Sequence, residues 1–300
     1  MARNFVRSIS FPLSPSRSSK PRAPSSSSCH ARSVSLPCWS HPILAHLHTH
    51  IRAVRAWAQQ GPASESSSMA AGLGHVEALH AALGYLLDLP EAQAALSGAG
   101  MASDRMLDAF LRLADAHGCF QESVVALKQD VAEALAAVRR RDGARLASAV
   151  RAQRRAGKEL ARLAVVAREC AVRPSRLSLM GGGAAEVEVT RLLMESAAAT
   201  AAASATLFGT VAAMSSSVAS GAVESCSCKR TAALVYLVKA KKKSRSGDQV
   251  EDEETMTAVA ERLEELEECI EELEAGSEKV FRSLVQTRVA LLNIHTIHIF

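Results

Sequence analysis

The sequence predicts an all-α protein, an elongated multi-helix bundle with a long C-terminal heptad-bearing helix and a disordered N-terminal tail. Aromatic residues make up only 4% of the chain, and alanine, which favours helix and close helix packing, fills much of the rest. From Thr255 to Ile294, apolar residues recur at alternating steps of three and four, which is typical of one long helix with a buried seam. The seam positions are Met256, Val259, Leu263, Leu266, Ile270, Leu273, Ser277, Val280, Leu284, Thr287, Leu291 and Ile294.

A second apolar stripe begins after Gly276 on this C-terminal helix. Its members are Phe281, Val285, Val289 and Leu292. The stripe predicts that the narrow seam widens there and that the helix enters the core. A homo-oligomer held together by the seam is the alternative, but the widened face favours packing within one chain.

Residues 1–40 are rich in serine, proline and arginine and too poor in apolar residues to fold alone. No acidic residue precedes Glu65, so the segment also matches the composition of organellar transit peptides. The seven cysteines are irregularly spaced, without a CxxC pair, and fit a reducing compartment. We therefore expect a cytoplasmic protein, with a membrane-peripheral location as one alternative and the chloroplast or mitochondrion as another.

The tail repeats one short pattern, R-S-x-S-x-P, in two places. In each copy an arginine precedes a serine by three residues and a proline follows it by two. This pattern resembles the phosphoserine motif of 14-3-3 proteins, which clamp the phosphate with arginine clusters. A linker of about 25 residues spans roughly 25–30 Å, so a dimeric reader could engage both copies. The candidate phosphorylation and docking residues are Arg7, Ser10, Pro12, Arg32, Ser35 and Pro37.

Beyond the tail, glycine and proline residues mark the expected ends of helices and divide the chain into further elements. His46 and His50 are four apart on the first helix, but no cysteine or carboxylate nearby completes a metal site, so we predict none. Gly118 is expected to end one helix and Gln121 to open the next. The predicted segments are a short helix at 41–60, a linker at 61–71, a bundle domain at 72–294 and a tail at 295–300. Within the bundle we expect a joint at Gly181–Gly183 and a charged loop at 239–252.

One predicted helix, Arg145 to Val172, has a strongly basic outer face. Nucleic acid is the weakest partner, because no aromatic residue interleaves the charges and no DNA-binding motif accompanies them. We favour a structural role, as a solvated face beside the acidic C-terminal helix, and place an anionic membrane surface second. A second basic run follows after position 238. The basic surface residues are Arg151, Arg154, Arg155, Lys158, Lys241, Lys242 and Lys243.

The stretch between Glu195 and Glu224 carries no charge and is long enough to cross a bilayer. It consists mostly of alanine, serine and threonine, which gain little in lipid, so a tightly packed buried helix is the better interpretation. The chain shows no glycine-rich phosphate loop, no GxSxG and no HExxH, and we therefore predict neither an enzyme nor a cofactor.

Three stretches point to one known family. They are Arg32-Ser33-Val34-Ser35-Leu36-Pro37 with Ser40-His41-Pro42, Leu87-Asp88-Leu89-Pro90 with Gln93 and Leu96, and Phe281 to Val289 with Leu291-Leu292-Asn293-Ile294. Together they resemble the plant BYPASS-related family. The resemblance runs from about residue 30 to 294, and its C-terminal motif is quite specific. The chain departs from the family in the histidine-rich segment after Pro42 and in the tail after Ile294. The resemblance implies a helical plant protein of root and shoot development with no established enzyme activity and no agreed site residues.

Overall fold

The computed structural model describes residues 42–61, 66–97, 100–171, 183–238 and 247–297, all within the compact unit Ser35–Phe300. Every element in these ranges is a helix, so the predicted all-α class is confirmed. The helices are α1 (Pro42–Gln60), α2 (Ser66–Leu87), α3 (Pro90–Ser97), α4 (Gly100–Arg139), α5 (Gly143–Glu169), α6 (Ala184–Val238) and α7 (Gly247–Ile297).

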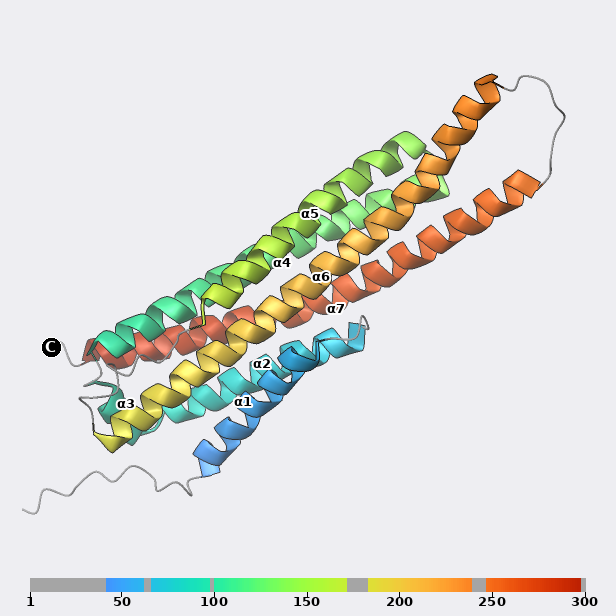
Figure 1. The fold of residues 1–300 in the computed structure, drawn as a ribbon. Helices are drawn as coiled ribbons and strands as arrows, with labels where there is room; N and C mark the ends of the chain where they lie inside the picture. Colours follow the sequence, from blue (N-terminus) through green and yellow to red (C-terminus); the bar gives the residue numbers. More distant parts are fainter. Residues whose placement is uncertain (1–41, 62–65, 98–99, 172–182, 239–246, 298–300) are drawn as a thin grey trace, which may run out of the picture. The chain divides into compact units, whose positions relative to one another are not determined.

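The long helices pack lengthwise in a bundle (Figure 1). The most extensive contacts join α5 to α6, α4 to both α5 and α7, and α2 to α7. Helices α4 and α7 are antiparallel, because Asp104 near the start of α4 meets His295 at 3.6 Å, while Arg139 at its end meets Glu264 at 3.2 Å. Helix α4 therefore lies between α5 and α7.

The predicted seam of α7 is confirmed. Eleven of its twelve residues are buried and Met256 is half-buried, and α2 and α4 cover them. The second stripe was placed wrongly: Val285, Val289 and Leu292 are 38–46% exposed, and only Phe281 is partly buried. At 100° per residue these three positions lie far around the helix from the seam, and the described helices leave them exposed.

The predicted break at Gly118 is absent, because α4 continues through it to Arg139. A glycine inside a helix costs about 1 kcal/mol relative to alanine. The flanking residues Ala114, His117 and Phe120 are all buried, and a Cβ at Gly118 would lie 3.7 Å from the ring of Phe281. Packing on both sides of the glycine therefore outweighs its intrinsic preference.

Several boundaries differ from the expected ones. Helix α2 begins at Ser66, inside the predicted linker 61–71, and α7 begins at Gly247, inside the predicted charged loop 239–252. At the other end α7 continues to Ile297, into the predicted tail. Asp142 caps α5 by accepting hydrogen bonds from the backbone N–H groups of Ala144 and Arg145, both at 3.1 Å. The joint at Gly181–Gly183 and the loop residues 239–246 fall mostly outside the described residues.

Among the described residues, one helical segment, Glu186–Ala222 of α6, is long and apolar enough to span a membrane. Within it, 61% of an apolar 18-residue window is buried inside the bundle, and α5, α1 and α7 pack against α6. Such burial is typical of the core helix of a packed domain. Its small side chains allow α5 to approach closely: a Cβ at Gly157 would lie 3.1 Å from the hydroxyl of Ser216.

Candidate functional site: charged faces of a polar-cored bundle

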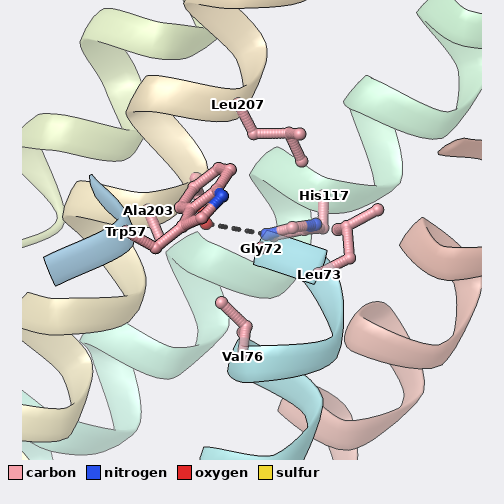
Figure 2. Close-up of a pocket in the computed structure, with 8 residues that line it drawn as sticks. Trp57, Gly72, Leu73, Val76, His117, Ala203 and Leu207 are labelled. Atoms are coloured by element: carbon pink, nitrogen blue, oxygen red, sulfur yellow. Dashed lines mark hydrogen bonds between the residues drawn. The ribbon is translucent and has the colours of Figure 1, made fainter. Parts of the chain in front are cut away.

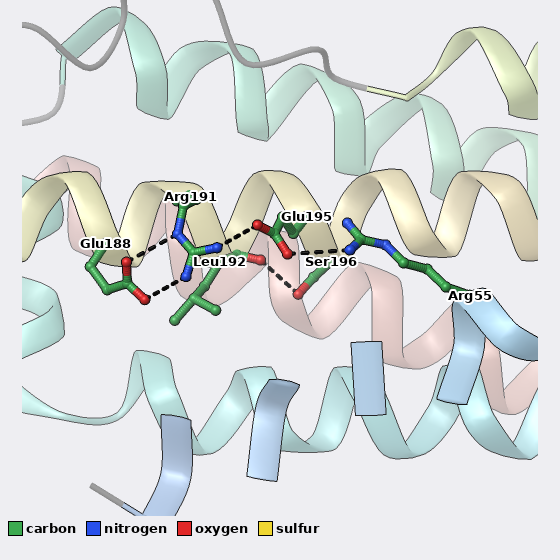
Figure 3. A network of polar contacts seen from close by, with 6 residues as sticks. All are labelled: Arg55, Glu188, Arg191, Leu192, Glu195 and Ser196. Atoms are coloured by element: carbon green, nitrogen blue, oxygen red, sulfur yellow. Dashed lines mark hydrogen bonds and ion pairs between the residues drawn. The ribbon is translucent and has the colours of Figure 1, made fainter. Parts of the chain in front are cut away.

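A network of ion pairs attaches α1 to α6 (Figure 3). Arg191 binds the carboxylate of Glu188 at 2.7 and 3.0 Å and that of Glu195 at 2.5 Å, and Arg55 of α1 reaches Glu195 at 3.4 Å. Hydrogen bonding from Arg191 lowers the pKa of Glu188. These groups are only partly buried and every carboxylate has a cation, so the network orients α1 and leaves no unpaired charge for chemistry.

His80 of α2 joins three helices in the core. Its Nδ1 lies 2.9 Å from the hydroxyl of Thr287 and its Nε2 lies 3.2 Å from that of Thr200. Because the Thr287 hydroxyl already donates to the carbonyl of Ser283, Nδ1–H donates to Thr287 and Nε2 accepts from Thr200. Burial lowers the pKa of His80 to about 4, so the ring is neutral and structural. This bond explains why a threonine fills a seam position of α7.

His117 of α4 lines a small internal cavity (Figure 2). Its Nε2 lies 2.8 Å from the hydroxyl of Ser204, and its Nδ1 has no partner among the described residues. The cavity, about 10 Å³, is bounded by Trp57, Gly72 and Leu207, among others, and is no larger than one water molecule. Burial lowers the pKa of His117 to about 3. The cavity is therefore too small for a substrate.

The predicted basic residues of α5 have exposed side chains. Arg151, Arg154, Arg155 and Lys158 are exposed, and so is Arg162 one turn further on. We call these five residues the α5 basic face. Arg162 pairs with Glu159 at 3.3 Å, and Asp130 of α4 lies within electrostatic range of Arg155. The described residues supply no ion pair to Arg151, Arg154 or Lys158, so this face carries a surplus of positive charge.

Helix α7 carries the opposite charge on its outer side. Glu261, Glu265, Glu268 and Glu272 are exposed and recur at steps of four, three and four; we call them the α7 acidic stripe. The expectation that the basic helix lies beside this acidic helix was wrong, because α5 packs mainly on α6 and α4 while α7 packs on α4 and α2. The acidic stripe itself was missed as a site, although its spacing is visible in the sequence.

The other predicted site residues lie outside the described residues. This applies to the tail positions Arg7, Ser10, Pro12, Arg32, Ser35 and Pro37 and to Lys241, Lys242 and Lys243. On α1, His46 and His50 bring their Nε2 atoms to 3.1 Å, as one hydrogen-bonded pair. The described ranges contain no group of three or more His, Cys, Asp or Glu residues that could hold a metal ion.

Fold and surface together define a helical bundle protein with polar contacts buried for packing and charge concentrated on separate outer faces. Residues 72–294 match the model of the family described as Protein BPS1, and the chain belongs to that family. Its members are plant developmental regulators of unknown molecular function, with no known catalytic activity. Searches of the curated proteins and of the solved structures give no match.

Proposed function

We propose that this chain is a non-enzymatic scaffold in root and shoot development that works by docking. The α5 basic face is its folded docking surface, and the N-terminal tail is a second, phosphorylation-dependent one. The observation that carries the proposal is the set of exposed cations on α5, with three of the five lacking an ion pair among the described residues. Uncompensated like charges one helical turn apart repel one another, and an acidic partner would relieve that repulsion.

The interior supports a docking role over a catalytic one. Within the described ranges, the fully buried histidines His80 and His117 are neutral and bound to hydroxyl groups, and the internal cavity beside His117 is water-sized. The larger depressions on the described part are shallow. The groove between α4 and α5, for example, has a volume of about 480 Å³, and its charged lining residues are Glu122, Asp130, Arg155 and Glu159.

The tail proposal rests on the duplicated R-S-x-S-x-P pattern around Ser10 and Ser35. Phosphate at both serines would give a dimeric 14-3-3-type reader two arginine-flanked sites on one flexible segment. The test is binding of a doubly phosphorylated peptide of residues 1–45 to a 14-3-3 protein, with the unphosphorylated peptide as control. Equal binding of the two peptides would show that the tail is not a phosphorylation-dependent 14-3-3 site.

Proximity labelling in plant cells tests both surfaces at once. The three chains compared are wild type, Ser10→Ala with Ser35→Ala, and Arg151→Gln with Lys158→Gln. We expect each variant to lose a different subset of labelled neighbours. The proposed function fails if both variants keep the wild-type neighbours. A reporter fused to residues 1–64 separates the organellar alternative, since a diffuse cytosolic signal would exclude import.

A further inference from the structure

The exposed stripe of α5 has a longer pattern than its basic residues alone. Four of the five residues of the α5 basic face, all except Arg154, belong to one row with steps of four and three, which consists of Arg151, Arg155, Lys158, Arg162, Val165 and Glu169. All six are exposed, Val165 at 53%. The order is therefore four cations, one apolar residue and one anion, over five helical turns on one side of the helix.

The outer side of α7 shows the same order with every charge reversed. Its exposed positions at identical steps are Glu261, Glu265, Glu268, Glu272, Ala275 and Lys279. Four anions are followed by one small apolar residue and one cation. Each α5 residue thus has an opposite or apolar counterpart at a constant offset along α7. The reversal at the last position matters most, because a simple block of acid against a block of base would lack it.

From this match we infer that the α5 basic face of one molecule binds the α7 acidic stripe of a second copy of this chain. The inference rests on the proposed function, since it names the partner of the docking surface. The two stripes of one molecule cannot meet, because α4 separates α5 from α7. The contact joins two different surfaces, so each copy keeps one unused stripe and the assembly can grow into a chain.

The end residues fix the direction of the contact. A parallel alignment places Glu169 opposite Lys279 and Val165 opposite Ala275, with all four cations opposite anions. An antiparallel alignment would place Glu169 opposite Glu261 and Arg151 opposite Lys279, and like charges in contact repel. The helices therefore pair in parallel.

An anionic membrane offers less to the same face. Lipid headgroups would attract the five cations of the α5 basic face but would repel Glu169, which lies on the same side of α5. The α7 stripe satisfies both signs. Exposed ion pairs are individually weak and screened by salt, so we expect a reversible association that depends strongly on ionic strength.

The test is sedimentation velocity of the full chain over a range of protein concentrations, at about 20 mM and at about 0.5 M salt. At the higher salt concentration the Debye length is well below 10 Å, so exposed charges are screened. We expect concentration-dependent association at low salt and monomer at high salt. Two variants reverse one stripe each: Arg151→Glu with Arg155→Glu and Lys158→Glu, and Glu261→Lys with Glu265→Lys and Glu268→Lys. Circular dichroism confirms that each variant folds.

For each reversed variant alone, the association constant should fall by at least about tenfold, which corresponds to about 1.4 kcal/mol, because several ion pairs become like-charge pairs together. An equal mixture of the two should associate again, since each reversed stripe now meets its complement. A mixture that stays monomeric would overturn the inference. Glu169→Lys should weaken association of the wild-type chain, and stronger association would refute the parallel alignment.

Pelleting with vesicles of anionic and of neutral lipid is the remaining arm. If the wild-type chain stays monomeric at low salt but pellets with anionic vesicles through α5, the partner of α5 is a membrane and not a second copy of the chain. In that case the docking function of α5 stands and the inferred partner is wrong. If the wild-type chain does not self-associate and reversal of the α5 charges leaves the labelled neighbours unchanged, the proposed docking function of α5 fails as well.

Discussion

Replacing Gly72 by alanine should destabilise the protein by forcing α1 away from α2. A Cβ at Gly72 would lie 2.2 Å from Cζ2 of Trp57, deep inside van der Waals contact with a rigid ring. The ring has no free direction to yield, because its Nε1–H donates to the carbonyl of Ser68 at 2.9 Å. The same helix offers a matched control in Gly74, where an added Cβ meets nothing within 4 Å.

The two substitutions should have effects of opposite sign. Gly74→Ala should stabilise by about 0.8–1.0 kcal/mol, because alanine is the better helix former and no atom is displaced. Gly72→Ala gains the same helix preference but adds overpacking, which typically costs about 1–3 kcal/mol. The difference between the two variants is therefore about 1–3 kcal/mol, with the common gain cancelled.

Urea unfolding followed by far-ultraviolet circular dichroism measures both free energies. In a Trp39→Phe background, Trp57 is the only tryptophan, and its emission should shift to the red in Gly72→Ala and stay unchanged in Gly74→Ala. Equal stabilisation by the two alanines, with no change in emission, would refute the packing of Trp57 on Gly72.

Three further outcomes follow from the core, the α5 cap and the α7 faces. His80 and His117 have pKa values lowered to about 4 and about 3, so the unfolded chain binds more protons below pH 6.5. The contribution of the two neutral histidines to the free energy of unfolding is fully present above pH 6.5. It should fall by about 1.4 kcal/mol per pH unit for each histidine as the pH drops toward those pKa values. Urea unfolding of the wild type and of His80→Gln at pH 7, 6 and 5 measures the difference in slope. Asp142→Ala removes the acceptor of two N–H groups and should cost about 1 kcal/mol in urea midpoint analysis, with Asp142→Asn as the conservative control. Leu284→Ala in the seam should cost about 2–5 kcal/mol, whereas Val289→Ala on the exposed strip should stay within about 0.5 kcal/mol, and equal costs would show that the strip is buried.

The seam of α7 could be predicted because it is a property of one helix repeated over many turns. The second stripe could not, since a row of valines on a helix shows only that these residues share a side. Whether that side meets another helix depends on the number of neighbours, and α7 has them on its seam side. The same limit explains Gly118, where burial of His117 and Phe120 in the assembled bundle outweighs the local preference.

The polar core was also beyond prediction, because its partners come from helices far apart in the sequence. Thr287 interrupts an otherwise apolar seam, and its partner His80 lies 207 residues away. A sequence pattern marks the polar seam position but cannot say which helix supplies the other half. The basic face of α5, by contrast, needed no partner to be recognised, since exposed charge on one side of a helix is a local property.

The distribution of polar groups also constrains where function can reside. Inside the bundle, His80, Thr200 and Thr287 saturate one another, and His117 binds Ser204, so these groups have little freedom to act on a ligand. On the outside, α5 and α7 display ordered charge that does not stabilise the fold, since exposed like charges at successive turns repel. Such patterns reduce the stability of an isolated molecule, and their electrostatic energy becomes favourable only when a surface of opposite charge is present. The ordered charge on the outer sides of α5 and α7 therefore supports the proposed docking role of these helices.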